Sequence, residues 1–432
     1  MYVERLRLTD FRNYRALDLA LPRGLVVFSG RNAQGKSNVL EAVTLAATSR
    51  SFRTSSDREV VRWGAPGRFA RVEANIARHE GPLHVELVVS DIAPPQEGTP
   101  TAGRSEQPSR AGSLSPPPAP FRKRIKVNGT PRRAMDLLGQ ATVVVFAPTD
   151  LEIVTGTPAE RRRFLDVTLC QVHPAYCRTL SQYQKVLTQR AALLRRIRDG
   201  EDEPHALGYW DEQLARLAVP IMRARAEFLR RAEADAARIY AELARGEAEN
   251  AEYADEMSDA DASLASEDAP AEPEPNALPL RLVYRPSLSA ELPEDEAAAQ
   301  AAFRAGLAAV RRRELAQGVN AVGPHRDDMA FLAGEMDLAI YGSRGQQRSA
   351  ALALKLAELR YIERETGDQP ILLLDDVLSE LDARRRADLL DAVAALDQVL
   401  LTTTDATALP ESARAHATLF DVRGGRVVRA TP

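Results

Sequence analysis

The stretch GRNAQGKS, Gly30 to Ser37, fits the pattern G-x-x-x-x-G-K-[ST] and decides the fold of this chain. It follows the strand-like run GLVVFS and opens a helix-like run with the apolar stripe Val39, Leu40, Val43 and Ala47. At this spacing glycines let backbone N–H groups point at a phosphate, Lys36 reaches the β/γ oxygens, and Ser37 binds Mg²⁺. The strand–loop–helix context favours an ATP-binding loop over an ordinary glycine-rich turn. The expected ATP contacts are Gly30, Arg31, Asn32, Ala33, Gln34, Gly35, Lys36 and Ser37.

A second stretch, ILLLDDVLSELD (Ile371 to Asp382), supplies two acids after four consecutive aliphatic residues. Such a run suits a central parallel strand covered on both faces, and its carboxyl end is where ligands sit in open α/β sheets. We expect Asp375 to hold the Mg²⁺ shell and Asp376 to polarise the attacking water as a general base. Lys36 and Asp376 are therefore the predicted catalytic residues.

A third stretch, YGSRGQQRSA (Tyr341 to Ala350), lies at the start of the helical run ALALKLAEL. A helix start presents free N–H groups and suits an anion, although a polar helix cap is the simpler interpretation. The order of P-loop, SRGQQ, LLLDD and SELD resembles the ATP-binding-cassette ATPases. The resemblance implies a signature that meets the γ-phosphate bound by a second molecule, with Ser343, Gly345 and Gln346 as its residues. It also implies that Glu380 and Asp382 lie near the dimer seam.

Two departures from that class concern the reaction rate. The class has Glu where this chain has Asp376, and its switch histidine aligns with Thr404, which Asp405 follows. Neither side chain can act as an imidazole does at neutral pH. We therefore predict a weak ATPase that is used as a switch and does not cycle rapidly. The glutamine loop of the class is not placed by the sequence.

Charge is unevenly distributed along the 432 residues. The segment 247–275 holds eleven acids and no Lys or Arg, and removing their charge from the net −4 leaves +7. A basic body with an acidic insert is compatible with DNA binding. No run approaches 20 apolar residues, which predicts no membrane span and a cytoplasmic protein. Cys170 and Cys177 are expected to be reduced thiols.

The predicted architecture is α/β, a P-loop ABC-type ATPase head (a mixed sheet with an antiparallel β lobe) plus an inserted α-helical domain. Residues 1–150 form the first part of the head, in which the Pro-rich segment 92–120 is expected to be a disordered insertion. Residues 151–245 form a helical arm, broken near Gly200–Pro204. Residues 246–280 form an acidic disordered linker, and residues 281–432 form the second part of the head.

At finer grain the chain resembles the RecF family of bacterial recombination-repair ATPases. The segments that carry the resemblance are LTDFRNYR, GRNAQGKSNVLEA, SFR, VVVFAPTDLEIVTGTPAERRRFLD, GPHRDD, SRGQQR and LLLDDVLSELD. The family implies ATP-dependent homodimerisation on DNA and a role with RecO and RecR in loading RecA at single-strand gaps. That role serves repair, replication restart and the SOS response. The first of these segments adds Arg12 and Asn13 to the candidate ATP contacts.

Basic clusters supply the candidate DNA contacts, which need only positive charge and give salt-dependent affinity. They are Arg122, Lys123, Arg124 and Lys126 on a predicted hairpin, and Arg195, Arg196 and Arg198 on the arm. Each cluster is as compatible with a solvated face. Since no aromatic residue is interleaved, duplex DNA is favoured over single strands. The family resemblance adds gap junctions as the expected target. Arg161 to Arg163 could join this basic stripe, although Arg161 and Arg162 are also candidates for a structural role. His325 is expected to be a structural or dimer-seam residue rather than a base.

The ATPase motifs would also suit two other functions. A cassette ATPase that energises a transporter is disfavoured because the switch histidine is absent and the insert is long, basic and interrupted. An SMC-like chromosome-structural head is disfavoured because the insert shows no sustained heptad.

Overall fold

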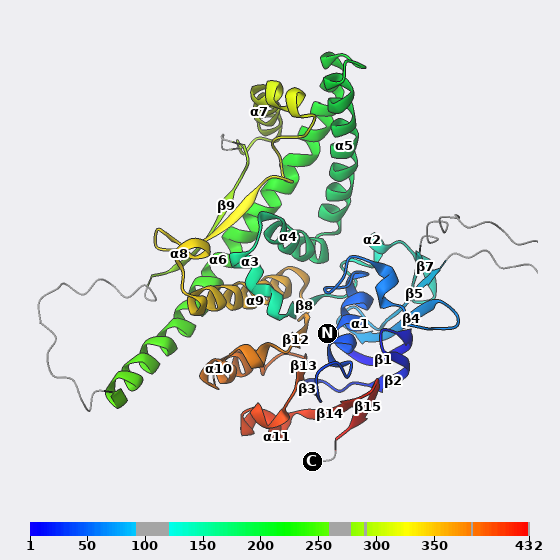
Figure 1. The fold of residues 1–432 in the computed structure, drawn as a ribbon, viewed down its shortest axis with the longest axis vertical. Coiled ribbons are helices and arrows are strands. Elements are labelled where there is room, and N and C mark those ends of the chain that lie inside the picture. Colours follow the sequence, from blue (N-terminus) through cyan, green and yellow to red (C-terminus); the bar gives the residue numbers. More distant parts are fainter. Residues whose placement is uncertain (92–120, 259–277, 289–291, 382, 431–432) are drawn as a thin grey trace, which may run out of the picture.

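The computed structural model describes residues 1–91, 121–258, 278–288, 292–381 and 383–430 (Figure 1). The predicted insertion 92–120 lies outside these residues. The head contains two six-stranded sheets with helix α1 (Lys36–Thr48) packed against both of them. This arrangement confirms the predicted ATPase head with its antiparallel β lobe.

The first sheet is antiparallel, with the strand order β2-β1-β4-β5-β6-β7. Its strands are β1 (Tyr2–Phe11), β2 (Tyr14–Ala20), β4 (Phe69–Ala77), β5 (Leu83–Asp91), β6 (Phe121–Val127) and β7 (Thr130–Arg132). Buried and exposed side chains alternate along β4, as expected for a sheet with one covered face. The predicted hairpin is confirmed, because Asn128 and Gly129 both have positive φ in the β6–β7 turn.

The second sheet is mixed, with the order β15-β14-β3-β13-β12-β8. Its strands are β3 (Gly24–Ser29), β8 (Val143–Phe146), β12 (Ile371–Asp375), β13 (Gln398–Thr403), β14 (Thr418–Arg423) and β15 (Arg426–Arg429). All pairs are parallel except β14–β15. Every residue of β12 is buried, which confirms that ILLLD is a covered central strand.

Helix α1 is buried more completely than its predicted stripe. Thr44, Leu45 and Ala46 are buried as well, so the stripe of four residues was too narrow. The reason is that α1 contacts strands of both sheets, which cover it on opposite sides. A helix that is apolar nearly all round is typical of this central position.

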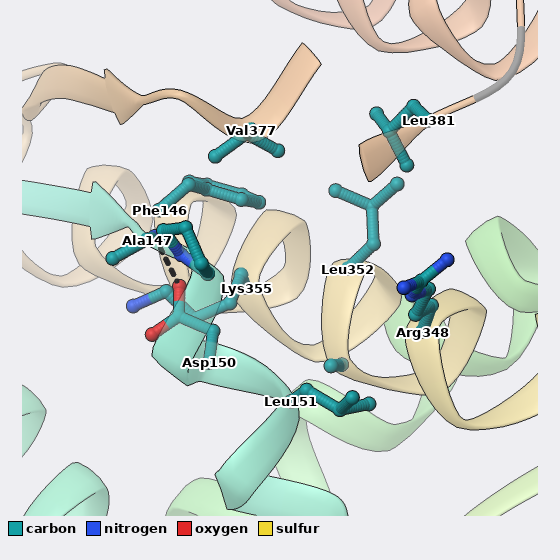
Figure 2. Close-up of a pocket in the computed structure, with 11 residues that line it drawn as sticks. Phe146, Ala147, Asp150, Leu151, Arg348, Leu352, Lys355, Val377 and Leu381 are labelled. Atoms are coloured by element: carbon teal, nitrogen blue, oxygen red, sulfur yellow. Dashed lines mark hydrogen bonds between the residues drawn. The ribbon is translucent and has the colours of Figure 1, made fainter. Parts of the chain in front are cut away.

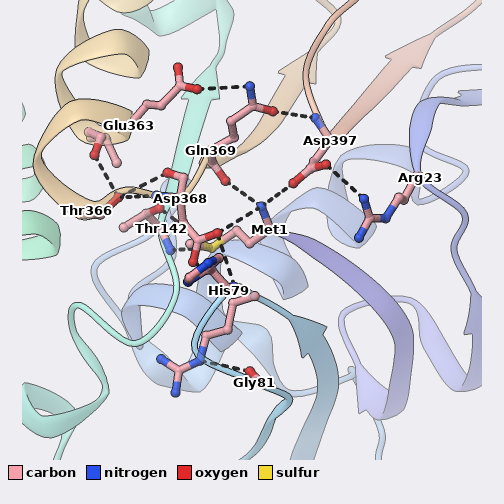
Figure 3. A network of polar contacts seen from close by, with 12 residues as sticks. Met1, Arg23, His79, Gly81, Thr142, Glu363, Thr366, Asp368, Gln369 and Asp397 are labelled. Atoms are coloured by element: carbon pink, nitrogen blue, oxygen red, sulfur yellow. Dashed lines mark hydrogen bonds and ion pairs between the residues drawn. The ribbon is translucent and has the colours of Figure 1, made fainter.

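The N-terminus is tied to the second half of the chain (Figure 3). The Met1 ammonium donates to the Gln369 carbonyl oxygen at 3.0 Å and to Asp397 Oδ2 at 2.7 Å. The Asp397 N–H donates in turn to Gln369 Oε1 at 2.9 Å. These contacts join β1 to the residues before β12 and β13, so both ends of the chain build one head.

The arm is helical and projects from the head (Figure 1). Its long helices are α4 (Pro158–Val172), α5 (Pro174–Arg198), α6 (Leu207–Ser258) and α7 (Glu296–Gln317). The predicted break near Gly200–Pro204 is confirmed between α5 and α6. Helix α6 continues to Ser258, past the predicted end of the arm at 245, because its acidic end is rich in the helix formers Ala and Glu. The rest of the predicted linker, 259–277, lies outside the described residues.

Helix α7 corrects the predicted start of the second head part at 281. It packs on α5 and α6 of the arm. Buried Arg190 of α5 joins the three helices, since it donates to Glu314 of α7 at 2.6 Å and to Asp211 of α6 at 2.9 Å. A buried charge must be paired, and its partners come from segments more than 20 residues away. The local pattern of α7 could not show this.

A three-stranded sheet of order β11-β10-β9 lies beside the arm helices. Its strands are β9 (Leu280–Arg285), β10 (Asp328–Ala333) and β11 (Met336–Asp337). Helix α9 (Arg344–Thr366) packs along α6. The shorter helices are α2 (Ala134–Leu137), α3 (Glu152–Thr155), α8 (Leu338–Tyr341), α10 (Ala383–Val393) and α11 (Glu411–His416). Within the described ranges, no helix combines the length and the apolar character that crossing a membrane requires.

Candidate nucleotide site

The loop between β3 and α1 needs glycine at two positions. A Cβ on Gly30, at φ 147°, would lie 2.4 Å from the Val422 carbonyl oxygen of β14. A Cβ on Gly35, at φ 115°, would lie 2.5 Å from the Asn13 side chain. The loop therefore packs closely on two other segments, and its tip, Arg31 to Ala33, is exposed.

The N-terminus of α1 has no side-chain cap in the described part of the chain. Gly35 is its N-cap residue in a left-handed conformation, and Ser37 lies in the first turn, half-buried. The N–H groups of that turn and the positive end of the helix dipole favour an anion at this position.

Lys36 is folded onto the loop. It is 6% exposed, and its Nζ donates to the carbonyl oxygens of Gly30 at 2.5 Å and Arg31 at 3.1 Å. Burial lowers the pKa of this ammonium, while the carboxylates of Asp376 and Asp375 act in the opposite direction. The structure thus brings the predicted lysine and both predicted acids into one electrostatic unit.

The acids lie one strand away from the loop, since β13 separates β3 from β12. Thr402 of β13 pairs with Asp375, and its hydroxyl donates to Asp375 Oδ1 at 2.8 Å. The Asp376 N–H donates to the same hydroxyl at 2.9 Å. Asp376 has φ 55° and begins the turn η5 (Val377–Glu380). Thr402 was not predicted, although a polar residue at the end of an apolar parallel strand was a usable signal.

Arg12 is held by a carboxylate that the sequence analysis missed. Glu41 of α1 is fully buried and accepts from Arg12 Nε at 2.9 Å and from Arg12 Nη2 at 2.6 Å. Ser51 Oγ donates to the same carboxylate at 2.5 Å. The segments LTDFRNYR and SFR are therefore neighbours of the first turns of α1. A lone acid in a buried apolar helix was the signal for Glu41.

Asn13 bridges the loop and α1. Its Nδ2 donates to the Gln34 carbonyl oxygen and its Oδ1 accepts from Asn38 Nδ2, both at 2.8 Å. The Tyr14 hydroxyl donates to the Gly35 carbonyl oxygen at 3.0 Å, and the Gly424 N–H donates to Gln34 Oε1 at 2.7 Å. The loop is thus preformed by contacts from the β1–β2 turn, β2 and the β14–β15 turn.

The predicted signature is a helix cap within one chain. Ser343 Oγ accepts from the Gln346 N–H at 3.1 Å, and Gln346 Oε1 accepts from the Ser343 N–H at 2.8 Å. Ser343 is exposed, Gly345 is half-buried and Gln346 is buried. Helix α8, which directly precedes them, lies well apart from α1 (Figure 1). A single chain therefore does not bring the signature to its own loop.

The remaining predicted positions are partly described. Glu380 ends the turn η5, and Asp382 lies outside the described residues. Thr404 is exposed after β13. Asp405 caps the turn η6 (Ala406–Ala408) by accepting from the Thr407 N–H at 2.8 Å, and its contacts with Thr407 lower the pKa of its carboxyl.

The hairpin cluster divides between the two faces of β6. Arg122, Arg124 and Lys126 are exposed, and Lys126 pairs with Glu86 at 2.9 Å. Lys123 points to the other face, as the strand period of two requires, and its Nζ donates to the Ser49 carbonyl oxygen at 2.5 Å. It also pairs with Asp57 at 2.6 Å. Lys123 is therefore an internal tether, so its prediction as an exposed DNA contact is wrong.

The arm cluster is exposed at the distal end of α5. Arg196 pairs with Asp202 at 2.6 Å and Arg198 pairs with Asp199 at 2.9 Å, so acids offset part of the charge of this cluster. Within one chain this end of α5 and the hairpin lie at separate places (Figure 1). Within the residues that the structure describes, the two clusters therefore do not join into one basic stripe.

The structural alternative is confirmed for Arg161, Arg162 and His325. Arg161 is buried and donates to Asp328 at 2.6 and 2.9 Å, and Arg162 donates to the Asp327 carbonyl oxygen at 2.8 Å. His325 Nδ1 lies 2.7 Å from the Tyr183 hydroxyl, and burial lowers the pKa of the imidazole to about 4. The segment GPHRDD thus joins the arm helices to β10.

Known proteins are similar to this chain in sequence and in fold. A family model described as an AAA domain matches residues 5–115. The DNA replication and repair protein RecF of Chloroflexus aurantiacus is 40% identical over 437 residues, 99% of both chains. RecF of Herpetosiphon aurantiacus is 40% identical over 94% of both chains, and RecF of Halalkalibacterium halodurans is 34% identical over 98% of both.

Solved structures give the same result. The recombination mediator protein RecF-ATPrS of the RecFOR pathway is 27% identical and superposes with a TM-score of 0.79 over 100% of this chain and 98% of that one. Its ATP form gives 0.78 at 26% identity, with the same coverage. An Smc head bound to ScpA is 14% identical with a TM-score of 0.50, covering 100% of this chain and 98% of that one, which is a likeness of fold alone.

Proposed function

The chain belongs to the RecF family of DNA replication and repair proteins, and from this premise we propose that it is an ATP-controlled DNA-binding switch. ATP would bind at the loop of residues 30–37, and two copies would close on DNA around two ATP molecules. The observation that carries the proposal is the electrostatic unit of Lys36, Asp375 and Asp376 beside the uncapped N-terminus of α1.

ATP binding would use the groups that the loop already orients. The N–H groups of α1 would receive the β-phosphate, and Lys36 would exchange its two carbonyl contacts for phosphate oxygens. Arg12 and Asn13 would hold the loop in place through Glu41 and Gln34. The ATP-bound structures of RecF support this assignment.

The donor set fits Mg²⁺, which prefers hard oxygen ligands. The Ser37 hydroxyl and the Asp375 carboxylate would hold it, with Asp375 oriented by Thr402. When bound, Mg²⁺ would neutralise charge on the phosphate oxygens. Asp376 would accept a proton from the attacking water.

Asp376→Asn tests the general-base role without disturbing the backbone. Asn tolerates the left-handed φ of 55° that this position requires, whereas longer or branched residues fit it poorly. We expect ATP hydrolysis to fall by about 100-fold while ATP-driven dimerisation persists. Steady-state phosphate release and sedimentation in parallel measure the two. Hydrolysis at the wild-type rate would remove Asp376 from the mechanism.

The second copy would supply the signature. The start of α9, which follows α8, lies away from the loop of its own chain, so a facing partner is the arrangement in which Ser343, Gly345 and Gln346 would meet a γ-phosphate. Glu380 and Asp382 would lie at that seam. Sedimentation velocity with and without ATP tests the proposal, which fails if the chain stays monomeric at saturating ATP.

DNA contact would come mainly from Arg122 and Arg124, with Arg195, Arg196 and Arg198 as a second patch. The natural DNA target would be a gap junction in duplex, and the partners would be RecR and RecO, acting in the cytoplasm on the path that loads RecA. The RecFOR pathway of the solved relative supports these partners.

A salt titration of duplex binding tests the hairpin. The slope of log K against log salt is negative, and each lost phosphate contact makes it shallower by about 0.9. We expect R122A/R124A to make the slope shallower by about 2 units. The matched control Arg429→Ala, on β15, should leave the slope unchanged. An equal slope for all three proteins would remove the hairpin from the interface.

A further inference from the structure

A buried group of charges lies where the signature helix meets the catalytic sheet (Figure 2). Strand β8 is the parallel neighbour of β12, so its carboxyl end lies at the same sheet edge as Asp375. The turn η2 (Pro148–Leu151) starts there and contacts α9. The group therefore connects that edge to the helix whose first turn is the signature.

Lys355 is the centre of this group. It is 6% exposed, and its Nζ donates to Glu358 one turn later on α9. Thr168 of α4 donates to Glu358 Oε1 at 2.6 Å. The ammonium also lies 5.3 Å from the ring centroid of Phe164 and 5.8 Å from that of Phe146, which ends β8.

Asp150 of η2 is the second acid beside Lys355 (Figure 2). Its Oδ2 accepts from the Ala147 N–H at 2.9 Å. Burial raises the pKa of this carboxyl to about 6, and Lys355 opposes the shift. Burial alone would lower the pKa of Lys355, but Glu358 and Asp150 together outweigh it and raise it. One lysine thus balances two carboxylates that belong to different elements.

We propose that Lys355 is a positioning residue that fixes the signature helix to the sheet edge beside the acids of the nucleotide site. A helix is a rigid rod, and Ser343 lies about 18 Å along it from Lys355. Because a buried charge tolerates little displacement from its surroundings, the position of the Lys355 ammonium beside Phe146 and near Asp150 sets where the signature stands. The inference rests on the proposed function, in which that signature meets ATP bound by a second copy.

A cavity of about 60 Å³ lies beside these charges. It is lined by Phe146 of β8, Leu352 of α9, and Val377 and Leu381 around the turn η5, which follows Asp376 (Figure 2). Three elements therefore meet at Lys355: the end of β8, the signature helix α9 and the turn η5 after Asp376. A larger side chain at 355 has room here.

The test compares Lys355→Met with Lys355→Arg in the full-length protein. We expect Met to leave the Kd of the monomer for ATP within about twofold and to lower kcat and ATP-driven dimerisation by about tenfold, because only the coupling between the sites is lost. Arg keeps the charge and should restore both. If Met lowers ATP affinity as much as kcat, or if it lowers neither, the positioning role is wrong.

A neutral triple variant controls for folding, since Lys355→Met alone leaves the buried Glu358 and the half-buried Asp150 without their cation. K355M/D150N/E358Q keeps similar volumes without charge. We expect thermal unfolding to show that this variant is folded. Its ATP-driven dimerisation should still be about tenfold weaker than that of the wild type. Dimerisation equal to wild type would overturn the inference. A wild-type protein that fails to dimerise with ATP would instead overturn the proposed function itself.

Discussion

Two helices of this molecule begin after short polar, glycine-containing stretches, and they begin in opposite ways. Helix α1 starts at Gly35, which has no side chain to offer, and its first turn is open in the described structure. Helix α9 starts at Ser343, which forms a reciprocal capping box with Gln346. The first start is thus prepared for an external anion, while the second satisfies itself.

The contacts around the N-terminus of α1 also differ from those around the N-terminus of α9. Contacts from the β1–β2 turn, β2 and the β14–β15 turn hold the loop before α1 in shape. The start of α9 follows the exposed side chains of Ile340 and Tyr341. We infer that the phosphate-binding site at α1 is complete within one chain, whereas the proposed dimer would bring a ligand to the start of α9.

The largest effect is expected at the complete site. Lys36→Met removes the ammonium beside the loop, so we expect ATP affinity to fall by about 100-fold or more, with no ATP-driven association. Calorimetry measures the affinity and sedimentation the association. Lys185→Met, an exposed lysine on α5, is the matched control and should behave as wild type. Dimerisation of Lys36→Met at the wild-type ATP concentration would contradict the assignment.

The next effect tests whether the second site acts in trans. Ser343→Arg adds bulk and charge beside Arg344 at the exposed start of α9. We expect dimerisation to weaken by about 100-fold and hydrolysis to stop, with monomer ATP affinity nearly unchanged. Equilibrium dialysis at dilute protein isolates the monomer affinity. Outright loss of ATP binding would show that the signature serves its own chain.

A smaller effect comes from giving α1 the cap that α9 has. Gly35→Ser places a Cβ 2.5 Å from the Asn13 side chain at a φ that disfavours serine, and its hydroxyl competes for the open N–H groups. We expect ATP affinity to fall by about tenfold. Calorimetry against wild type measures it. An unchanged affinity would mean that the open start of α1 is not where phosphate binds.

The smallest effect comes from the reciprocal change. Ser343→Gly removes the side-chain cap of α9 but keeps a residue that helix starts accept, so unfolding should become easier by a few tenths of a kcal/mol. Ser343→Ala should cost about 1 kcal/mol. Chemical denaturation of both variants measures the difference. If Ala and Gly cost the same, the capping box contributes little to the stability of α9.

The sequence by itself determined the local parts of this protein. The loop of residues 30–37, the covered strand before Asp375 and Asp376, the Asn128–Gly129 hairpin and the break between α5 and α6 were all predicted correctly. Each depends on neighbours within about ten residues, whose spacing and turn chemistry are read directly from the chain.

Only the tertiary structure decided which distant groups meet. It showed that Glu41 anchors Arg12, that Thr402 orients Asp375, that Lys123 is an internal tether and that α7 belongs to the arm. A buried charge or donor needs a partner, but the chain leaves open which of many distant residues supplies it. That choice is made by packing, and it separates the preformed site at α1 from the signature at α9.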